Sequence, residues 1–132
     1  MSEQLLPPGA YLAWRYVDAR RAIDRRQIYY EDGRIDALEG RESWELCRFT
    51  YPQVAAAKAA ITESGLPTSI DVPATGTHDT ALVTYQWRLD GVEGCVSNAG
   101  YPALQHNAMD RLDAKLAELE EAAGGWPLLS DE

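Results

Sequence analysis

Hydrophobic and polar residues alternate on both sides of an Asp-Gly dipeptide near the end of the chain, a pattern typical of an antiparallel hairpin. Counting outward from Asp90-Gly91 places Trp87 opposite Gly94, so the indole ring covers the gap that the glycine leaves. In this register one face is apolar and should point into a core: Val83, Tyr85, Trp87, Leu89, Val92 and Val96. A slip by one residue would move the tryptophan into water.

A second Asp-Gly dipeptide predicts a second hairpin, closer to the start of the chain. Counting outward from Asp32-Gly33 as a two-residue turn places Tyr30 opposite Ile35 and Tyr29 opposite Asp36. The predicted inner face is then Ile28, Tyr30, Ile35 and Ala37. This register leaves Tyr29 on the polar, outward face.

Each hairpin leads to a predicted helix. Residues 50–53 (Thr-Tyr-Pro-Gln) fit a capping box, so the first helix should begin there, run to Ser64 and end at Gly65. The second helix is predicted from about Pro102 to Ala123. Its apolar stripe comprises Leu104, Ala108, Met109, Leu112, Leu116 and Leu119.

The remaining segments complete a prediction of the α+β class. Residues 11–17 alternate as a strand, residues 44–49 fit either an extended or a partly helical segment, and residues 66–80 indicate a long connection. We expect one domain over residues 1–132, with loosely ordered tails at 1–9 and 130–132. It should contain an antiparallel sheet of four to five strands, with two helices on one face in the order ββ-α-ββ-α.

Charge and cysteine content narrow the choice of partner and compartment. The 132 residues contain 12 Lys and Arg and 21 Asp and Glu, and the net charge of −9 argues against binding to nucleic acid or to an anionic membrane. Six basic and five acidic side chains fall in residues 1–34, so the other 98 residues carry −10. A basic protein is the partner that such a chain favours. Two cysteines, and a start without signal-peptide features, indicate a cytoplasmic protein.

Three features could carry chemistry, and each also has a structural explanation. His78 lies beside Asp79 in a polar loop, and His106 and Asp110 are four residues apart in the second predicted helix. Cys95 falls on the polar face of its hairpin. A turn, a solvated helical pair and a half-buried thiol account for the three more simply. We therefore assign no catalytic residue, no metal ligand and no cofactor.

The stronger signals concern protein binding. Four arginines fall within seven positions, and they either pair with Asp18, Asp24 and the acidic second helix or bind a ligand. Four tryptophans and seven tyrosines stand against one phenylalanine, a bias typical of interfaces. The candidate partner-binding residues are Tyr29, Trp44, Arg20, Arg21, Arg25 and Arg26.

These observations predict a small, acidic, non-catalytic protein-binding module, of the inhibitor or immunity type that blocks a larger partner. The hairpin, helix, hairpin, helix order with two Asp-Gly turns resembles the emfourin type of metalloprotease inhibitor, and the resemblance implies no role for any single residue. The alternative is an enzyme or small-ligand binder that uses His78, Asp79 and His106. A homodimer through an edge strand or exposed aromatic rings is a further alternative.

Overall fold

The chain forms one antiparallel sheet of six strands with two helices, in a computed structural model that describes residues 6–73, 81–101 and 104–124. The strands are β1 (Ala10–Asp18), β2 (Ile23–Tyr30), β3 (Arg34–Glu39), β4 (Glu42–Arg48), β5 (Ala81–Leu89) and β6 (Val92–Tyr101). The helices are α1 (Tyr51–Glu63) and α2 (Asn107–Ala122), and two 3₁₀ turns are η1 (Ala19–Arg21) and η2 (Leu66–Thr68). The sheet order is β4-β3-β2-β1-β5-β6. The α+β class is confirmed, and the sheet is slightly larger than the predicted four to five strands.

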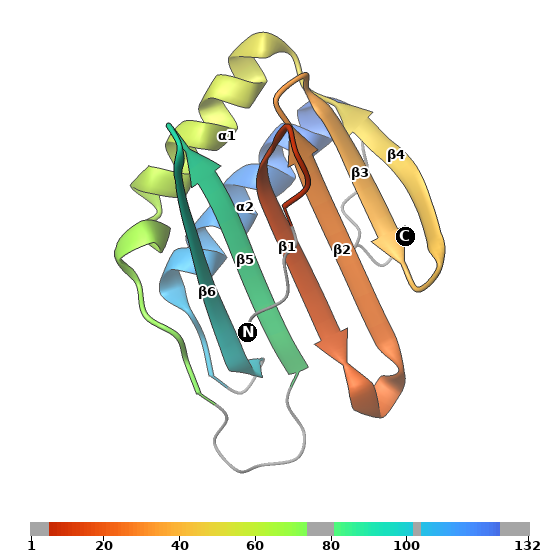
Figure 1. The fold of residues 1–132 in the computed structure, drawn as a ribbon, viewed down its shortest axis with the longest axis vertical. Helices are drawn as coiled ribbons and strands as arrows, with labels where there is room; N and C mark the ends of the chain where they lie inside the picture. The colour runs from red at the N-terminus through yellow and green to blue at the C-terminus, as the bar shows by residue number, and fades with distance from the viewer. Residues whose placement is uncertain (1–5, 74–80, 102–103, 125–132) are drawn as a thin grey trace.

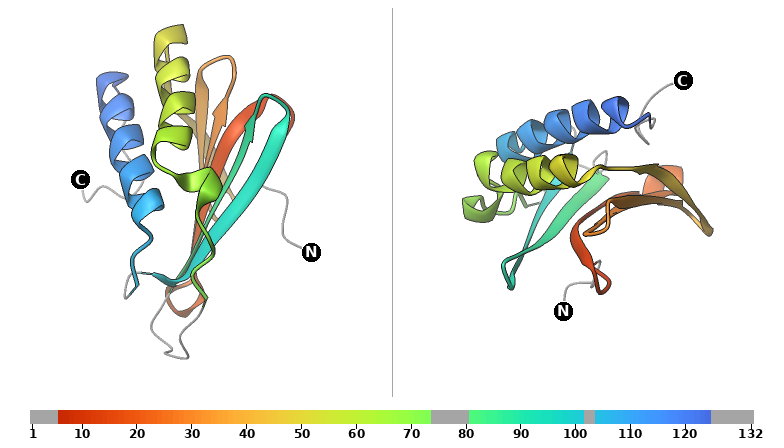
Figure 2. Two further views of the ribbon diagram at one scale, coloured as in Figure 1. Left: turned by 90° about the vertical axis from the view of Figure 1, so that its left-hand side faces the viewer. Right: turned by 90° about the horizontal axis from the view of Figure 1, so that it is seen from above.

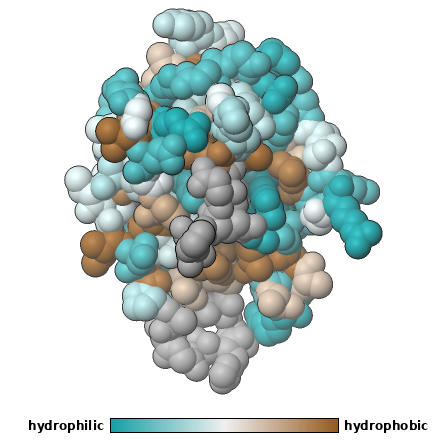
Figure 3. Space-filling view, viewed as in Figure 1, coloured by the Kyte–Doolittle hydropathy of each residue, from teal (hydrophilic) through white to brown (hydrophobic). Residues whose placement is uncertain are grey.

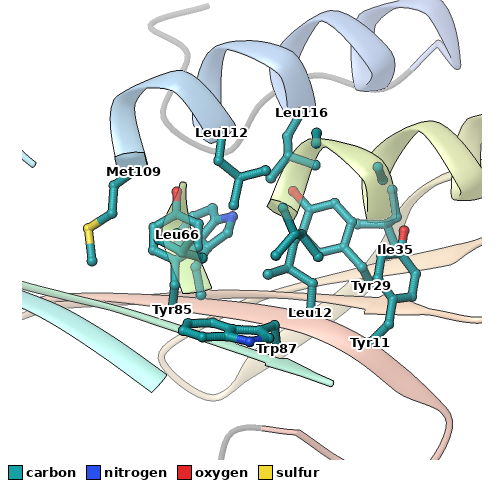
Figure 4. Close-up of a cluster of buried hydrophobic side chains, with 14 of the residues drawn as sticks. Tyr11, Leu12, Tyr29, Ile35, Leu66, Tyr85, Trp87, Met109, Leu112 and Leu116 are labelled. Atoms are coloured by element: carbon teal, nitrogen blue, oxygen red, sulfur yellow. The ribbon is translucent and has the colours of Figure 1, made fainter. Parts of the chain in front are cut away.

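Both helices cover the same side of the sheet, as predicted (Figures 1 and 2). We call this the helix-facing side, and the opposite one the outer side. Alternate residues of each strand point to the helix-facing side, where they form the main core with apolar residues of α1 and α2. Figure 4 shows Leu112 and Leu116 of α2 above Leu12, Tyr29 and Tyr85 of the sheet.

The β5–β6 hairpin has the predicted register. Leu89 pairs with Val92 across the turn, and Trp87 pairs with Gly94. Asp90 and Gly91 both have positive φ, 52° and 80°, as a two-residue type I′ turn requires. A Cβ built on Gly94 would lie 2.1 Å from the Trp87 ring, so the indole does cover the glycine. Only Val92 departs from the predicted core face, because it is 67% exposed at the end of the hairpin.

The predicted register of the β2–β3 hairpin is wrong by one residue. Tyr29 pairs with Ile35, not with Asp36, and residues 31–33 form a three-residue loop in which Gly33 has φ +98°. The glycine at the third loop position adds one residue to the turn. Because side chains alternate along a strand, this shift exchanges the two faces of β2. Tyr29 is therefore fully buried in the core, and its predicted place on the polar side is wrong.

The first helix confirms the capping prediction, whereas the second begins later than predicted. Thr50 and Gln53 form both hydrogen bonds of the capping box, and Ser64 caps the C-terminal end of α1. Helix α2 begins at Asn107, five residues after Pro102, because the His106 side chain accepts from the Met109 N–H and caps the helix there. Residues 44–49, which the sequence left open between strand and helix, are extended: all but Phe49 belong to the edge strand β4.

The outer side carries a small second cluster at its centre. Leu6, Ala10 and Ala13 are buried there, with Ile28 and Tyr30 packed against them. Ile28 and Tyr30 therefore lie opposite to the core side predicted for them, and Leu6 packs within the stretch 1–9 that was expected to be a loose tail. Around the cluster, hydrophilic and hydrophobic residues are interspersed (Figure 3). The predicted tail at 130–132 lies outside the described residues.

A candidate binding pocket beneath helix α2

A pocket opens between the first two turns of α2 and the helix-facing side of β1, β5 and β6. The centre of a water molecule can move within about 70 Å³ of it, which is room for several waters or for one small polar group. We call it the α2 pocket. Its walls are Trp14, Tyr16, Val83, Tyr85, Asn98, Tyr101, His106, Met109, Asp110 and Asp113.

Strand register and helical spacing bring these side chains together. Trp14 pairs with Tyr85 on the neighbouring strand, and Tyr16 pairs with Val83 in the next row, so both rows point to the helix-facing side. The rings of Tyr16 and Tyr101 meet edge to face, with centroids 5.7 Å apart and planes at 88°. From α2, Met109, Asp110 and Asp113 face the rings, since residues three and four apart share one side of a helix.

Two buried polar residues at the pocket have structural tasks. The Asn98 amide donates to the Leu104 carbonyl oxygen at 2.9 Å and accepts from the Gly100 N–H at 2.9 Å. His106 Nδ1 accepts from the Met109 N–H, so Nε2 carries the proton and donates to the Ile70 carbonyl oxygen at 3.0 Å. Both ring nitrogens of His106 are therefore occupied by the fold. His78 and Asp79, its predicted companions, lie outside the described residues.

Other polar groups at the pocket have no such task, among them the Tyr85 hydroxyl and the carboxylates of Asp110 and Asp113. Within the described part of the chain, the Tyr85 hydroxyl has no hydrogen-bond partner although the residue is only 4% exposed. Burial, then the charges of Asp113, Glu120 and Asp110, raise the pKa of Tyr85 well above its ordinary value. Asp113 is exposed as a residue, yet desolvation of its carboxyl group raises its pKa, and Asp110 raises it further. The pocket thus presents a neutral hydroxyl and two neighbouring carboxylates.

No lysine or arginine of the described residues forms an ion pair with these carboxylates. All 12 lysines and arginines belong to the described residues, and none of the ion pairs among those residues involves Asp110 or Asp113. Apart from Asn98 and His106, whose polar groups are engaged by the fold, the other walls of the pocket are apolar or aromatic. The arrangement is complementary to a positively charged group from outside the chain, because such a group can both contact carboxylates and lie against aromatic rings.

The predicted arginine cluster lies at the β1–β2 connection and is engaged in internal ion pairs. Arg20 and Arg21 lie 3.8 and 3.7 Å from Asp18, and Arg25 lies 3.2 Å from Glu39. Arg26 lies 3.9 Å from Asp24. Asp18 and Asp24 are thus among the partners, as expected, whereas Arg25 pairs with Glu39 of β3 and not with the acidic second helix. Arg25 is the β2 neighbour of Tyr16 on β1 and so points to the helix-facing side, but it does not line the α2 pocket.

Of the two predicted aromatic candidates, one is exposed and the other is buried. Trp44 is 40% exposed on the edge strand β4, where it pairs with Ala37. Tyr29 is buried, and its hydroxyl bonds to the carboxylate of Glu120, which is itself only 3% exposed. Gln27 Nε2 donates to the Tyr29 oxygen at 2.8 Å and to Glu120 at 3.2 Å. Tyr29 is thus part of a buried polar network in the core and is not available to a partner.

Neither thiol has the surroundings of a reactive cysteine. Burial, followed by the charges of Glu120 and Glu45, raises the pKa of Cys47 to about 11. Burial also raises the pKa of Cys95, which lies on the exposed part of β6. A raised pKa keeps a thiol protonated and unreactive at neutral pH. In the described ranges, no three His, Cys, Asp or Glu side chains are grouped so that they could hold a metal ion.

Comparisons with known proteins found no matching family model, no similar curated protein and no similar solved structure. Across residues 6–73, 81–101 and 104–124, the structure has no helix of the length and apolar character needed to cross a membrane.

Proposed function

We propose that this chain is a non-catalytic binding domain that docks a basic protein against the α2 pocket. The observation that carries the proposal is the pair Asp110 and Asp113, two carboxylates beside aromatic rings with no cation of the chain within ion-pair distance in the described residues. The net charge of −9 supports it, because long-range attraction speeds the approach of a positively charged partner. An acidic inhibitor or immunity-type protein acts in this manner.

The proposed surface differs from the one expected from the arginine cluster. Each of the four arginines lies near a carboxylate of the chain, namely Asp18, Asp24 or Glu39, so their charge is partly compensated before a partner arrives. The pocket rim, in contrast, combines half-exposed rings with unpaired acids. Tyr and carboxylate groups that become buried on binding are suited to carry affinity. Arg25 and Trp44 lie on the same side of the sheet and would border the docked partner.

The test is capture of a partner at two salt concentrations, with charge-matched variants. D110N/D113N removes two negative charges at the pocket, and E118Q/E121Q removes two from exposed positions further along α2. We expect the wild-type chain and E118Q/E121Q to retain the same basic protein at low salt and to release it as salt rises. D110N/D113N should retain much less. Equal retention by both double variants, or capture of acidic proteins only, would contradict the proposal.

A further double variant distinguishes the docking proposal from the enzyme or metal-site alternative. The enzyme or metal-site alternative requires His78 and Asp79, whereas a docking surface at the α2 pocket does not. H78A/D79A should therefore leave retention of the basic partner unchanged. His106 is a poor choice for this test, because its replacement removes the cap of α2. The mass of the purified chain in solution, measured alongside, determines whether a homodimer forms.

A further inference from the structure

The α2 pocket has a narrower chemical preference than general attraction to positive charge. All of its polar groups that lack a partner among the described residues can accept hydrogen bonds: the Asp110 and Asp113 carboxylates and the hydroxyl oxygens of Tyr16, Tyr85 and Tyr101. Tyr85 is only 4% exposed as a residue, while the two carboxylates belong to exposed residues of α2. A ligand that satisfies them must carry several N–H donors spread over a few ångströms.

The aromatic walls of the pocket favour a donor group that is flat and can lie against a ring. Trp14 and Tyr85 are more than nine-tenths buried, and Tyr16 and Tyr101 are half-buried, so four rings surround the space. A flat cation can lie against such rings while its edge reaches the carboxylates. A compact ammonium is more strongly hydrated than a guanidinium, so it loses more hydration free energy on entering an aromatic pocket. A quaternary ammonium matches the rings but has no N–H for Asp110, Asp113 or Tyr85.

We propose that the α2 pocket is a receptor for a guanidinium group, and specifically for one arginine side chain of the basic partner. The guanidinium would lie against the rings of Tyr16 and Tyr101 and donate to Asp110 and Asp113, with the Tyr85 hydroxyl as the innermost acceptor. The space of about 70 Å³ open to the centre of a water molecule admits a group of this size. This inference rests on the proposed function and names what the partner inserts.

Direct titration with small arginine derivatives tests the assignment without knowledge of the partner. The probe is N-acetyl-arginine methylamide, added to the full chain and followed by NMR shifts of the Trp14 indole N–H and the rings of Tyr85 and Tyr101. The matched controls are the citrulline derivative, which has the same shape without the charge, and the lysine derivative. We expect saturable, millimolar binding of arginine, at least about threefold tighter than lysine, and no saturation with citrulline.

Variants locate the bound group. D110N/D113N should weaken arginine binding by about tenfold or more, since two charge-assisted hydrogen bonds are lost. E118Q/E121Q should leave it within about twofold of wild type, because exposed charges outside the pocket contribute little. Y85F should weaken it by a few fold while the fold is retained, which the unchanged shifts of residues outside the pocket would verify.

Several outcomes would overturn the inference. Absence of saturable shifts, equal binding of citrulline, or tetramethylammonium or lysine binding as tightly as arginine would each refute a guanidinium site. Shifts that saturate but stay the same in D110N/D113N would place the binding elsewhere. If arginine fails while protein capture still depends on Asp110 and Asp113, the docking proposal stands and the arginine assignment falls. If both fail together, the proposed function falls as well.

Discussion

The stability of this protein should decrease as the pH rises from weakly acidic to weakly alkaline, because Glu120 is buried in the core. Desolvation raises the pKa of Glu120 from 4.5 to about 7, against the opposing hydrogen bonds from Tyr29 and Gln27. The folded chain therefore binds a proton more tightly than the unfolded chain does. The protonated Glu120 carboxyl adds to the free energy of unfolding. This contribution is complete below pH 4.5, the ordinary pKa, and is lost as the pH rises through about 7, the pKa in the folded chain.

The surroundings of Glu120 explain why the cost of burying its charge is only partly compensated. The ionisable groups that interact with it come from four strands and from its own helix: Tyr11, Tyr29, Cys47, Tyr85 and Asp113. Each of these is neutral or negative when it titrates, and none is a cation. Ionised Glu120 consequently keeps only hydrogen bonds, which compensate the loss of hydration incompletely.

The size of the effect follows from the two pKa values. A rise from 4.5 to about 7 corresponds to about 3 kcal/mol over the whole titration. About 2 kcal/mol of this falls between pH 5.5 and 8, which is a large part of the roughly 5–15 kcal/mol that holds a domain folded. The melting temperature should drop by roughly 6–8 °C over the same interval.

Urea unfolding of the wild type, E120Q and E118Q at pH 5.5, 6.5, 7.5 and 8 measures this effect. E120Q keeps the shape of the side chain and removes its titration, so its stability should be nearly flat with pH. E118Q removes an exposed carboxylate of the same helix and should follow the wild type. Asp113, whose pKa is also raised, leaves a small residual slope in all three chains. If E120Q and E118Q have the same pH dependence, Glu120 does not titrate in the folded core and the reasoning fails.

Three further predictions concern single contacts. Gly94→Ala should cost about 1–3 kcal/mol in urea unfolding, because its Cβ would lie 2.1 Å from the Trp87 ring; a loss under about 0.5 kcal/mol would show that Trp87 moves freely. Thr50→Ala should cost about 1 kcal/mol and shorten α1 as judged by amide hydrogen exchange in its first turn, since it breaks the capping box. Tyr29→Phe should destabilise by about 1–3 kcal/mol because it removes the buried hydroxyl that bonds to both Glu120 and Gln27, whereas Tyr85→Phe should be neutral or stabilising. Equal losses for the two tyrosines would contradict the hydrogen-bond assignments.

The sequence predicted one hairpin well and the other badly, for a definable reason. Both contain Asp-Gly, but Asp90-Gly91 fills a two-residue turn, whereas Asp32-Gly33 is the end of a three-residue loop that begins at Glu31. The Asp-Gly dipeptide alone does not determine whether the loop has two or three residues. The difference of one residue moved Tyr29 from the surface to the core and joined it to Glu120, 91 residues away.

The candidate site was missed because its parts are ordinary when read one at a time. Tyr85 was assigned to the apolar face of its hairpin, which is correct, Tyr16 was only part of the predicted strand 11–17, and Asp110 was considered only as a companion of His106. Asp113 fits a solvated helix position. The signal that could have found the site is the spacing of Met109, Asp110 and Asp113, which places acids beside the apolar stripe of α2. That signal gains meaning only when β1 and β5 are known to pack beneath the helix.

The two acids of the pocket are not needed for the fold, and this is the main reason to connect them with binding. Helix α2 is anchored by Met109, Leu112 and Leu116 in the core, while Asp113 is partly desolvated beside a like charge. Asp110, in the first helical turn, gains a little from the helix dipole. Neutralising both should therefore leave the free energy of unfolding unchanged or increase it slightly, while binding is lost. If removing the two acids costs no stability but abolishes capture of a partner, their role is in binding and not in folding.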